Sequence, residues 1–276
     1  MILIQKAIKQ IKGKDDYVYI ILYIIPFFYV DIYGLLFLIS AISILLLMRF
    51  NKKVYMKKGY IQWVDSIYII FSIIGCYLIT ILLDLGYFNE GLVINGINLI
   101  PSYILAYYFI IPIIYMIIRQ PIYLKNMWKI NFKIGLFTIL ICLPNIITSI
   151  VRIIVGAYNY ISPDNLIQNI FQFIFMAALL EELFFRGFLY NFFRDIIGKT
   201  SSTIITSLIF TFWHMSLVID AFNNYSMGAI YNLIAIMVLG ITNCLIIERT
   251  KSIIPCIVFH AVINGTFLNL ILLFVN

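Results

Sequence analysis

The sequence contains few charged side chains. Only 11% of its 276 residues are Asp, Glu, Lys or Arg, and 63% are hydrophobic. A soluble domain is about one quarter charged and about half apolar, so no soluble fold of this size can bury so much apolar surface. The composition therefore excludes an ordinary soluble protein and predicts a polytopic membrane protein, for which lipid is the main solvent.

Paired cysteines are also absent. The four cysteines occur singly in apolar segments, and the sequence contains no CxxC pair: Cys76, Cys142, Cys244 and Cys256. This spacing argues against a cysteine-based metal or redox site. We interpret the four residues as small buried hydrophobic side chains.

The positive charge does not indicate a nucleic-acid partner. The net charge is +7, but the lysines and arginines form short clusters between apolar runs. Such clusters determine the orientation of a chain in a membrane. Alternation of these clusters predicts a cytoplasmic N-terminus and places Arg194, Lys199, Arg249 and Lys251 on the cytoplasmic side.

The apolar runs predict a fold that is all-α. They are about 15–25 residues long and do not alternate with polar residues, which favours transmembrane helices over a β-barrel. The candidate spans are residues 17–31, 33–49, 64–84, 98–118, 133–156, 166–192, 202–219, 228–247 and 253–275. We expect a transmembrane helical bundle of about eight spans, within a bracket of seven to nine. Residues 1–160 are expected to form N-terminal spans of unknown role, and residues 161–276 a catalytic helical core.

Apart from Arg152 and residues near the span ends, five acidic, basic or histidine residues lie inside these spans, where charge is costly and by default indicates function. They are Glu181, Glu182, Arg186, His214 and His260. Glu182 and Arg186 are four residues apart and therefore share a helix face, where they can form an ion pair. Glu181 is rotated by about 100° from Glu182, which leaves it as a spare carboxylate.

The chain has only two histidines, and both lie in spans. Asn264 follows His260 by four residues, and Phe210 precedes His214 by the same spacing, so each pair shares a helix face. The expected topology places Glu181, His214 and His260 at depths of about 12–20 Å from the cytoplasmic side, at 1.5 Å per residue. The three side chains can therefore meet in one site inside the membrane.

A carboxylate, two imidazoles and an amide can hydrolyse a peptide bond. The carboxylate acts as a general base on water, and one histidine helps to orient that water. The other histidine and the amide can donate hydrogen bonds to the developing oxyanion. Glu181, His214 and His260 are also possible zinc ligands, although the HExxH spacing is absent.

Three motifs resemble those of a known family. "EELFFR" fits EExxxR, "FTFWH" fits FxxxH, and "HAVIN" fits HxxxN, in that order in the C-terminal half. Together they resemble the CPBP family of CAAX proteases and bacteriocin-processing enzymes, also called Abi. The resemblance covers roughly residues 165–276 and implies an intramembrane endopeptidase that depends on glutamate and needs no metal.

The resemblance also implies a role for each matching residue. Glu181 is expected to be the general base, and His214 to help activate water. The oxyanion site is expected to contain His260 and Asn264. The supporting residues are Glu182 and Arg186, together with Phe210 beside His214.

The expected substrate is a hydrophobic or lipidated peptide that reaches the site from the bilayer. The membrane lipid is an expected partner, and nucleic acid is not. The predicted location is a bacterial cytoplasmic membrane, with the active site facing the cytoplasm. Maturation of a bacteriocin or pheromone precursor, or self-immunity, fits these expectations. The alternative is a non-catalytic immunity protein or a proton-coupled transporter, in which the same residues relay protons.

Overall fold

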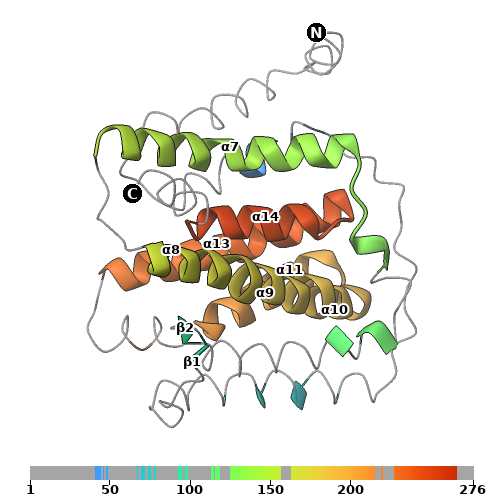
Figure 1. Cartoon of the computed structure of the whole chain (residues 1–276). Coiled ribbons are helices and arrows are strands. Elements are labelled where there is room, and N and C mark those ends of the chain that lie inside the picture. The colour runs from blue at the N-terminus through green and yellow to red at the C-terminus, as the bar shows by residue number, and fades with distance from the viewer. Residues whose placement is uncertain are drawn as a thin grey trace.

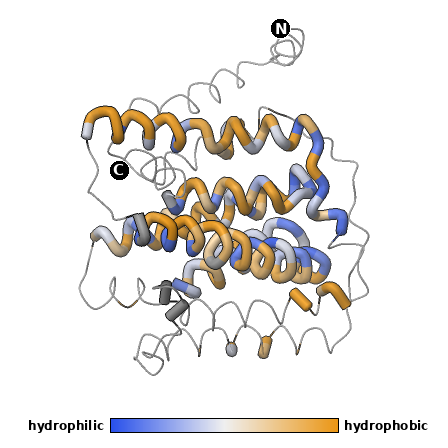
Figure 2. Tube along the Cα trace, viewed as in Figure 1, coloured by the Kyte–Doolittle hydropathy of each residue, from blue (hydrophilic) through white to orange (hydrophobic). Residues whose placement is uncertain are grey.

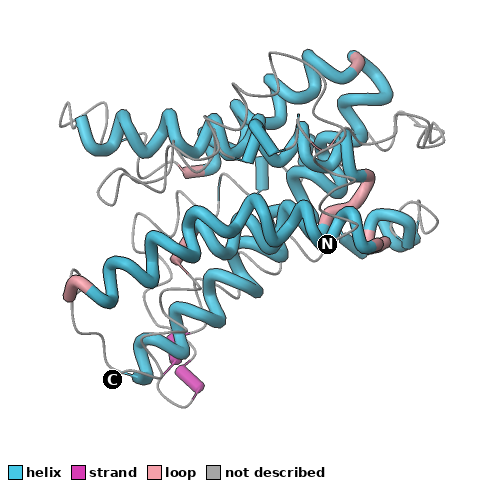
Figure 3. The backbone as a smooth tube through the Cα atoms, turned by 90° about the horizontal axis from the view of Figure 1, so that it is seen from above, coloured by secondary structure: helices cyan, strands magenta, loops and turns pink. Residues whose placement is uncertain are grey.

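A computed structural model of the chain describes residues 125–156, 163–214 and 227–265, together with scattered positions between 41 and 118 and Ile219. The regular structure of this part is helical (Figures 1 and 3), as the sequence predicted. Its one exception is a two-residue antiparallel pair of strands, β1 (Val93–Ile94) and β2 (Ile97–Asn98). Apart from those scattered positions, the four candidate spans before residue 119 lie outside the described residues.

Helix α7 (Phe132–Ile154) corresponds to the fifth predicted span. The side chain of Asn131 caps its first turn by accepting a hydrogen bond from the backbone N–H of Ile134, at 2.9 Å. Such a cap satisfies one of the amide groups that have no partner inside the helix. Residues 133–156 were predicted from their apolar run, and the helix begins and ends within two residues of those bounds.

The sixth predicted span is an unbroken run of helical elements that carries both glutamates. It comprises α8 (Pro163–Phe171), η2 (Gln172–Leu179), α9 (Leu180–Glu182), η3 (Leu183–Leu189) and α10 (Tyr190–Ile197). The two η segments are π-helices, which are rare and often occur at functional sites. Where η3 returns to α-helix, the side-chain amide of Asn191 donates to the carbonyls of Arg186 and Gly187, at 2.6 and 3.1 Å.

Three further helices follow: α11 (Lys199–Trp213), α13 (Met227–Thr250) and α14 (Ile254–Ile263). Gly198 separates α10 from α11 with a φ of 81°, a conformation that favours glycine. Helix α13 matches its prediction closely. In the span predicted at 202–219, helix α11 ends at Trp213, because His214 leaves the helical conformation. Of the later residues in that span, the structure describes only Ile219, which is helical. The span predicted at 253–275 is described as helix only to Ile263, and residues 266–275 lie outside the described part.

Helices α11 and α13 pack at very close range. A Cβ atom placed on Gly240 of α13 would lie 2.9 Å from the Cβ atom and 3.1 Å from the Cα atom of Ser207 on α11. Small residues at such crossings let two backbones approach, as is common between helices in membranes. On the other side, α14 packs against α7 and η2, so α14 lies inside the bundle (Figure 1).

Two of the described helices, α7 and α13, are long and apolar enough to cross a membrane. Less than half of each apolar window is buried, whereas the core helix of a soluble protein is mostly buried. Hydrophobic residues dominate α7 (Figure 2), and Phe132, Ile139 and Ile154 are 61–77% exposed. Polar side chains are instead fully buried: Glu182, Arg186, Ser202, Thr206, Ser207, Thr242 and Asn243. This distribution fits a lipid solvent; the number of spans stays a prediction.

Candidate active site

One oxygen atom of Glu182 is the centre of the polar site. Glu182 lies at the end of α9, and its Oε1 atom accepts three hydrogen bonds. The donors are Nη1 of Arg186 at 3.1 Å, Nδ2 of Asn243 at 2.9 Å and Nδ1 of His260 at 2.7 Å. The side chains of Glu182 and Arg186 are completely buried. Oε1 therefore joins the glutamate-bearing run to α13 and α14.

The hydrogen bond to Glu182 determines which ring nitrogen of His260 stays available. A carboxylate only accepts hydrogen bonds, so Nδ1 of His260 must carry the donated proton. Its other ring nitrogen, Nε2, lies 3.8 Å from Oε2 of Glu181. His260 is thus held at one nitrogen by Glu182 and faces Glu181 with the other.

Glu181 is the carboxylate left without a partner. Its side chain is only 13% exposed, and its Oε2 atom is buried without a hydrogen bond to any described residue. The distance of 3.8 Å to Nε2 of His260 is too long for a direct hydrogen bond. One water molecule can contact both atoms at this separation. The predicted division between a paired Glu182 and a spare Glu181 is therefore present in the geometry.

Phe210 connects Arg186 with both histidines. The guanidinium carbon of Arg186 lies 4.3 Å from the centroid of the Phe210 ring, a distance typical of a cation–π contact. The same ring makes edge contacts with the imidazoles of His214 and His260, at centroid distances of 5.1 and 5.9 Å. The predicted packing of Phe210 beside His214 is confirmed, and His260 lies beside the same ring.

His214 lies immediately after the last residue of α11. Its Nδ1 atom is 3.0 Å from the carbonyl oxygen of Phe210. Since a carbonyl only accepts hydrogen bonds, Nδ1 carries a proton, and in the neutral ring Nε2 then presents a lone pair. This arrangement suits a group that accepts a hydrogen bond from water.

Asn264 follows His260 by one turn and forms the C-terminal cap of α14. Its backbone N–H donates to the carbonyl oxygen of His260 at 3.0 Å, and the residue is half-buried. The spacing of one turn between the two residues is therefore present, with Asn264 as the cap that follows Ile263, and the shared face of their side chains stays a prediction.

The comparison with protein families agrees with this geometry. Residues 163–266 match the family model described as type II CAAX prenyl endopeptidase Rce1-like. This model is one of the CPBP family, and we call the matching residues the CPBP region. No curated protein and no solved structure matches the chain. The three motifs all lie inside the CPBP region, so the chain carries a protease-family region, and the family and the apolar helices together point to an integral membrane protein.

Sequence reasoning missed one member of the site in the CPBP region. Asn243 is completely buried on α13 and donates directly to Glu182. The signal that was available is an amide inside the span predicted at 228–247, because polar side chains within spans are rare and often functional. The spacing of Asn243 matches none of the three motifs, which explains why they did not include it.

A zinc site needs at least three ligand side chains that lie close together. Among the residues that the structure describes, no three His, Cys, Asp or Glu side chains are grouped as metal ligands are. This observation concerns side-chain placement, and the expectation of a metal-free site stays a prediction.

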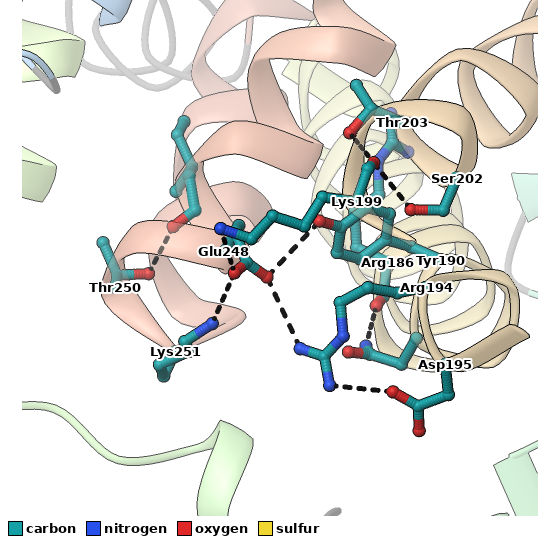
Figure 4. A network of polar contacts seen from close by, with 12 residues as sticks. Arg186, Tyr190, Arg194, Asp195, Lys199, Ser202, Thr203, Glu248, Thr250 and Lys251 are labelled. Atoms are coloured by element: carbon teal, nitrogen blue, oxygen red, sulfur yellow. Dashed lines mark hydrogen bonds and ion pairs between the residues drawn. The ribbon is translucent and has the colours of Figure 1, made fainter. Parts of the chain in front are cut away.

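A second polar cluster surrounds Glu248 near the end of α13 (Figure 4). Its Oε1 atom lies 3.0 Å from the ammonium groups of Lys199 and Lys251, and its Oε2 atom 3.4 Å from Nη1 of Arg194. These cations come from two basic clusters that the charge alternation placed on the same side of the membrane. The structure brings the two clusters together at one end of the bundle.

Proposed function

We propose that this protein is an intramembrane endopeptidase that hydrolyses a peptide bond with a water molecule activated by Glu181. One observation carries the proposal: a buried carboxylate oxygen without a partner lies 3.8 Å from an imidazole that a second carboxylate holds in place. An unsatisfied buried group costs free energy, so a free carboxylate oxygen that also faces a positioned imidazole favours a chemical role over a purely structural one. The CPBP family region supports the same reaction class.

Each residue of the site has a role in one step of the proposed reaction. Glu181 takes a proton from water, and the oxygen of that water attacks the carbonyl carbon of the peptide. Nε2 of His214 accepts a hydrogen bond from the same water and orients it. The proton on Glu181 then passes to the departing amine as the C–N bond breaks.

His260 and Asn264 are proposed to stabilise the oxyanion. His260 donates from Nε2 when that atom carries a proton, and the Glu182 carboxylate at Nδ1 stabilises the resulting charge. Removal of one preorganised oxyanion donor lowers kcat by about 10²–10³ in other hydrolases. The Arg186 ion pair balances the charge of Glu182, so the Glu182 carboxylate is not left unpaired inside the protein.

The proposed substrate is a hydrophobic or lipidated peptide. The apolar outer faces of α7 and α13 favour a site that is approached through lipid, and a peptide of this kind partitions into the bilayer. Maturation of a bacteriocin or pheromone precursor, or self-immunity, is the proposed role. We further propose that the reaction needs no metal, and that activity is retained in protein from which metal analysis detects no zinc.

The decisive variant is Glu181→Gln, which keeps the shape of the side chain and removes the base. General-base catalysis typically contributes about 10²–10⁴-fold, so we expect a loss of that size in cleavage. Mass spectrometry of small secreted peptides from cells with and without the variant reports the activity and the substrate together. Asp195→Asn is the matched control, since Asp195 pairs with Arg194 away from the site. Full cleavage by Glu181→Gln would reject the assigned base.

A non-catalytic role is the alternative, either as an immunity protein or as a proton-coupled transporter. The observation that favours it is the series Glu181, His260 and Glu182, whose separations of 3.8 and 2.7 Å resemble a proton relay. Proton flux in liposomes that depends on Glu181, without any peptide cleavage, would select this alternative.

A further inference from the structure

Asn243 lies where three helical elements meet. Its side chain on α13 reaches Glu182 at the end of α9. Its backbone carbonyl accepts a hydrogen bond from the thiol of Cys256 on α14, at 3.4 Å. Cys256 precedes His260 by four residues, so both lie on the same face of α14. Asn243 therefore contacts the carboxylate that holds His260 and the helix that carries His260.

Packing alone does not account for this residue. Asn243 is fully buried, and the Oδ1 atom of its amide has no hydrogen bond to any described residue. An unsatisfied buried amide oxygen is destabilising, and an apolar side chain of similar volume would avoid that cost. The useful part of the amide is thus its N–H group, which donates to Glu182.

Only one oxygen of the Glu182 carboxylate accepts hydrogen bonds from the described residues. Oε1 accepts from Arg186, Asn243 and His260, whereas Oε2 is buried without a partner among the described residues. A partial rotation of the carboxylate would move Oε1 away from Nδ1 of His260, and the imidazole would lose the hydrogen bond that orients it. Arg186 lies on the same helical run as Glu182 and moves with it. Apart from His260 itself, the contact that holds the carboxylate from a separate helix is therefore that of Asn243 on α13.

We propose that Asn243 is a positioning residue that locks the Glu182 carboxylate and thereby fixes the imidazole of His260 with Nε2 directed at Glu181. The inference rests on the proposed function for its effect on catalysis. Its structural part, the dependence of the His260 ring on Asn243, does not require peptidase activity.

Histidine-selective ¹⁵N NMR of the full chain in lipid nanodiscs tests the structural part. The chain has only two histidines, so the spectrum contains one pair of ring signals for each. Asn243→Leu removes the donor and keeps the branch point and the number of side-chain heavy atoms. We expect the short hydrogen bond at Nδ1 of His260 to weaken, with a shift of its ¹H and ¹⁵N signals. The signals of His214 should stay unchanged, because its Nδ1 bonds to a carbonyl of its own helix.

The activity arm uses the precursor peptide identified with Glu181→Gln. In Asn243→Leu, we expect kcat to fall about tenfold to a hundredfold, in line with the loss of one hydrogen bond to a charged group, while KM changes little. Asn243→Gln, which keeps an amide N–H on a longer arm, should recover part of the rate. Asn145→Leu on α7 is the matched control and should leave both readouts unchanged.

The outcomes separate the two proposals. His260 signals that are identical in the wild type and Asn243→Leu, with His214 unchanged as proof of folding, would overturn the positioning role. A shifted His260 signal in a protein that cleaves no peptide would support the positioning role and remove the proposed function. A fall in kcat with unaltered His260 signals would also overturn the inference, because the loss would then have another cause.

Discussion

Among the described residues, Arg186 is the one arginine or lysine in the buried site, and it contacts Glu182 and the rings of Phe185 and Phe210. Its guanidinium donates to Glu182 and lies over the ring of Phe210. Neither contact is exposed, so water cannot replace either one when it is lost. A buried ion pair need not stabilise a fold relative to apolar residues, but the removal of one member leaves an unpaired charge. Arg186 is therefore required wherever Glu182 stays ionised.

We predict that Arg186→Met lowers the free energy of unfolding by about 3–5 kcal/mol, the cost of breaking a buried ion pair from one side. Chemical unfolding in detergent, followed by tryptophan fluorescence, measures the change. Lys199→Met is the matched control, because the Lys199 side chain is 65% exposed and exposed ion pairs contribute about 0–1 kcal/mol. Equal destabilisation by both variants would show that burial does not set the cost.

Among the helical elements, the α11–α13 contact depends on the absence of a side chain. Gly240 leaves the space in which the backbone of Ser207 lies. This contact brings α11, which carries Phe210 and ends before His214, against the helix that carries Asn243. The separation of these two helices thus affects how Phe210 and Asn243 reach the Glu182 cluster.

We predict that Gly240→Ala destabilises the fold although alanine is the better helix former. The added Cβ would lie 3.1 Å from a backbone atom of Ser207, so the helices must move apart. Overpacking of this kind typically costs about 1–3 kcal/mol. The control is Gly135→Ala on α7, where a Cβ meets no atom within 4 Å and helix propensity should raise stability slightly. Thermal unfolding of the two variants in parallel measures both effects. A rise in Tm for both variants would contradict the close contact between α11 and α13.

In the molecule as a whole, apolar and charged side chains are distributed in the reverse of the way they are in a soluble protein. Apolar side chains cover the exposed faces of α7 and α13, and the charged groups of the site are enclosed. The Glu248 cluster collects Arg194, Lys199 and Lys251 at one end of the bundle (Figure 4). If that end is cytoplasmic, as the basic residues predict, the active site is reached from the cytoplasm or from the bilayer.

Cysteine labelling tests this orientation. We expect Lys199→Cys, at a side chain that is 65% exposed, to react with a membrane-impermeant maleimide only from the cytoplasmic side. Asn165→Cys, at the opposite end of the helical run, should react only from the outside. Cys142, Cys244 and Cys256 are buried, and a Cys76→Ser background removes the fourth cysteine. The reverse labelling pattern would invert the predicted topology.

Several features were predictable because they depend on neighbours along one helix. The pairing of Glu182 with Arg186 and the contact of Phe210 with His214 follow from a spacing of four residues. The bounds of α7 and α13 follow from long apolar runs between charged ends. The early end of α11 was not predictable, because His214 bonds back to the carbonyl of Phe210 and leaves the helix inside an apolar run.

The sequence by itself determined the solvent of this chain, its helical class and the small set of polar residues that lie within the apolar runs. Composition and periodicity act locally, so each can be read without knowledge of the fold. Only the tertiary structure decided that Glu182 holds His260, that Glu181 keeps a free oxygen beside it, and that Asn243 belongs to the site. These contacts join residues 61 and 78 positions apart, and their distances depend on how α9, α13 and α14 pack.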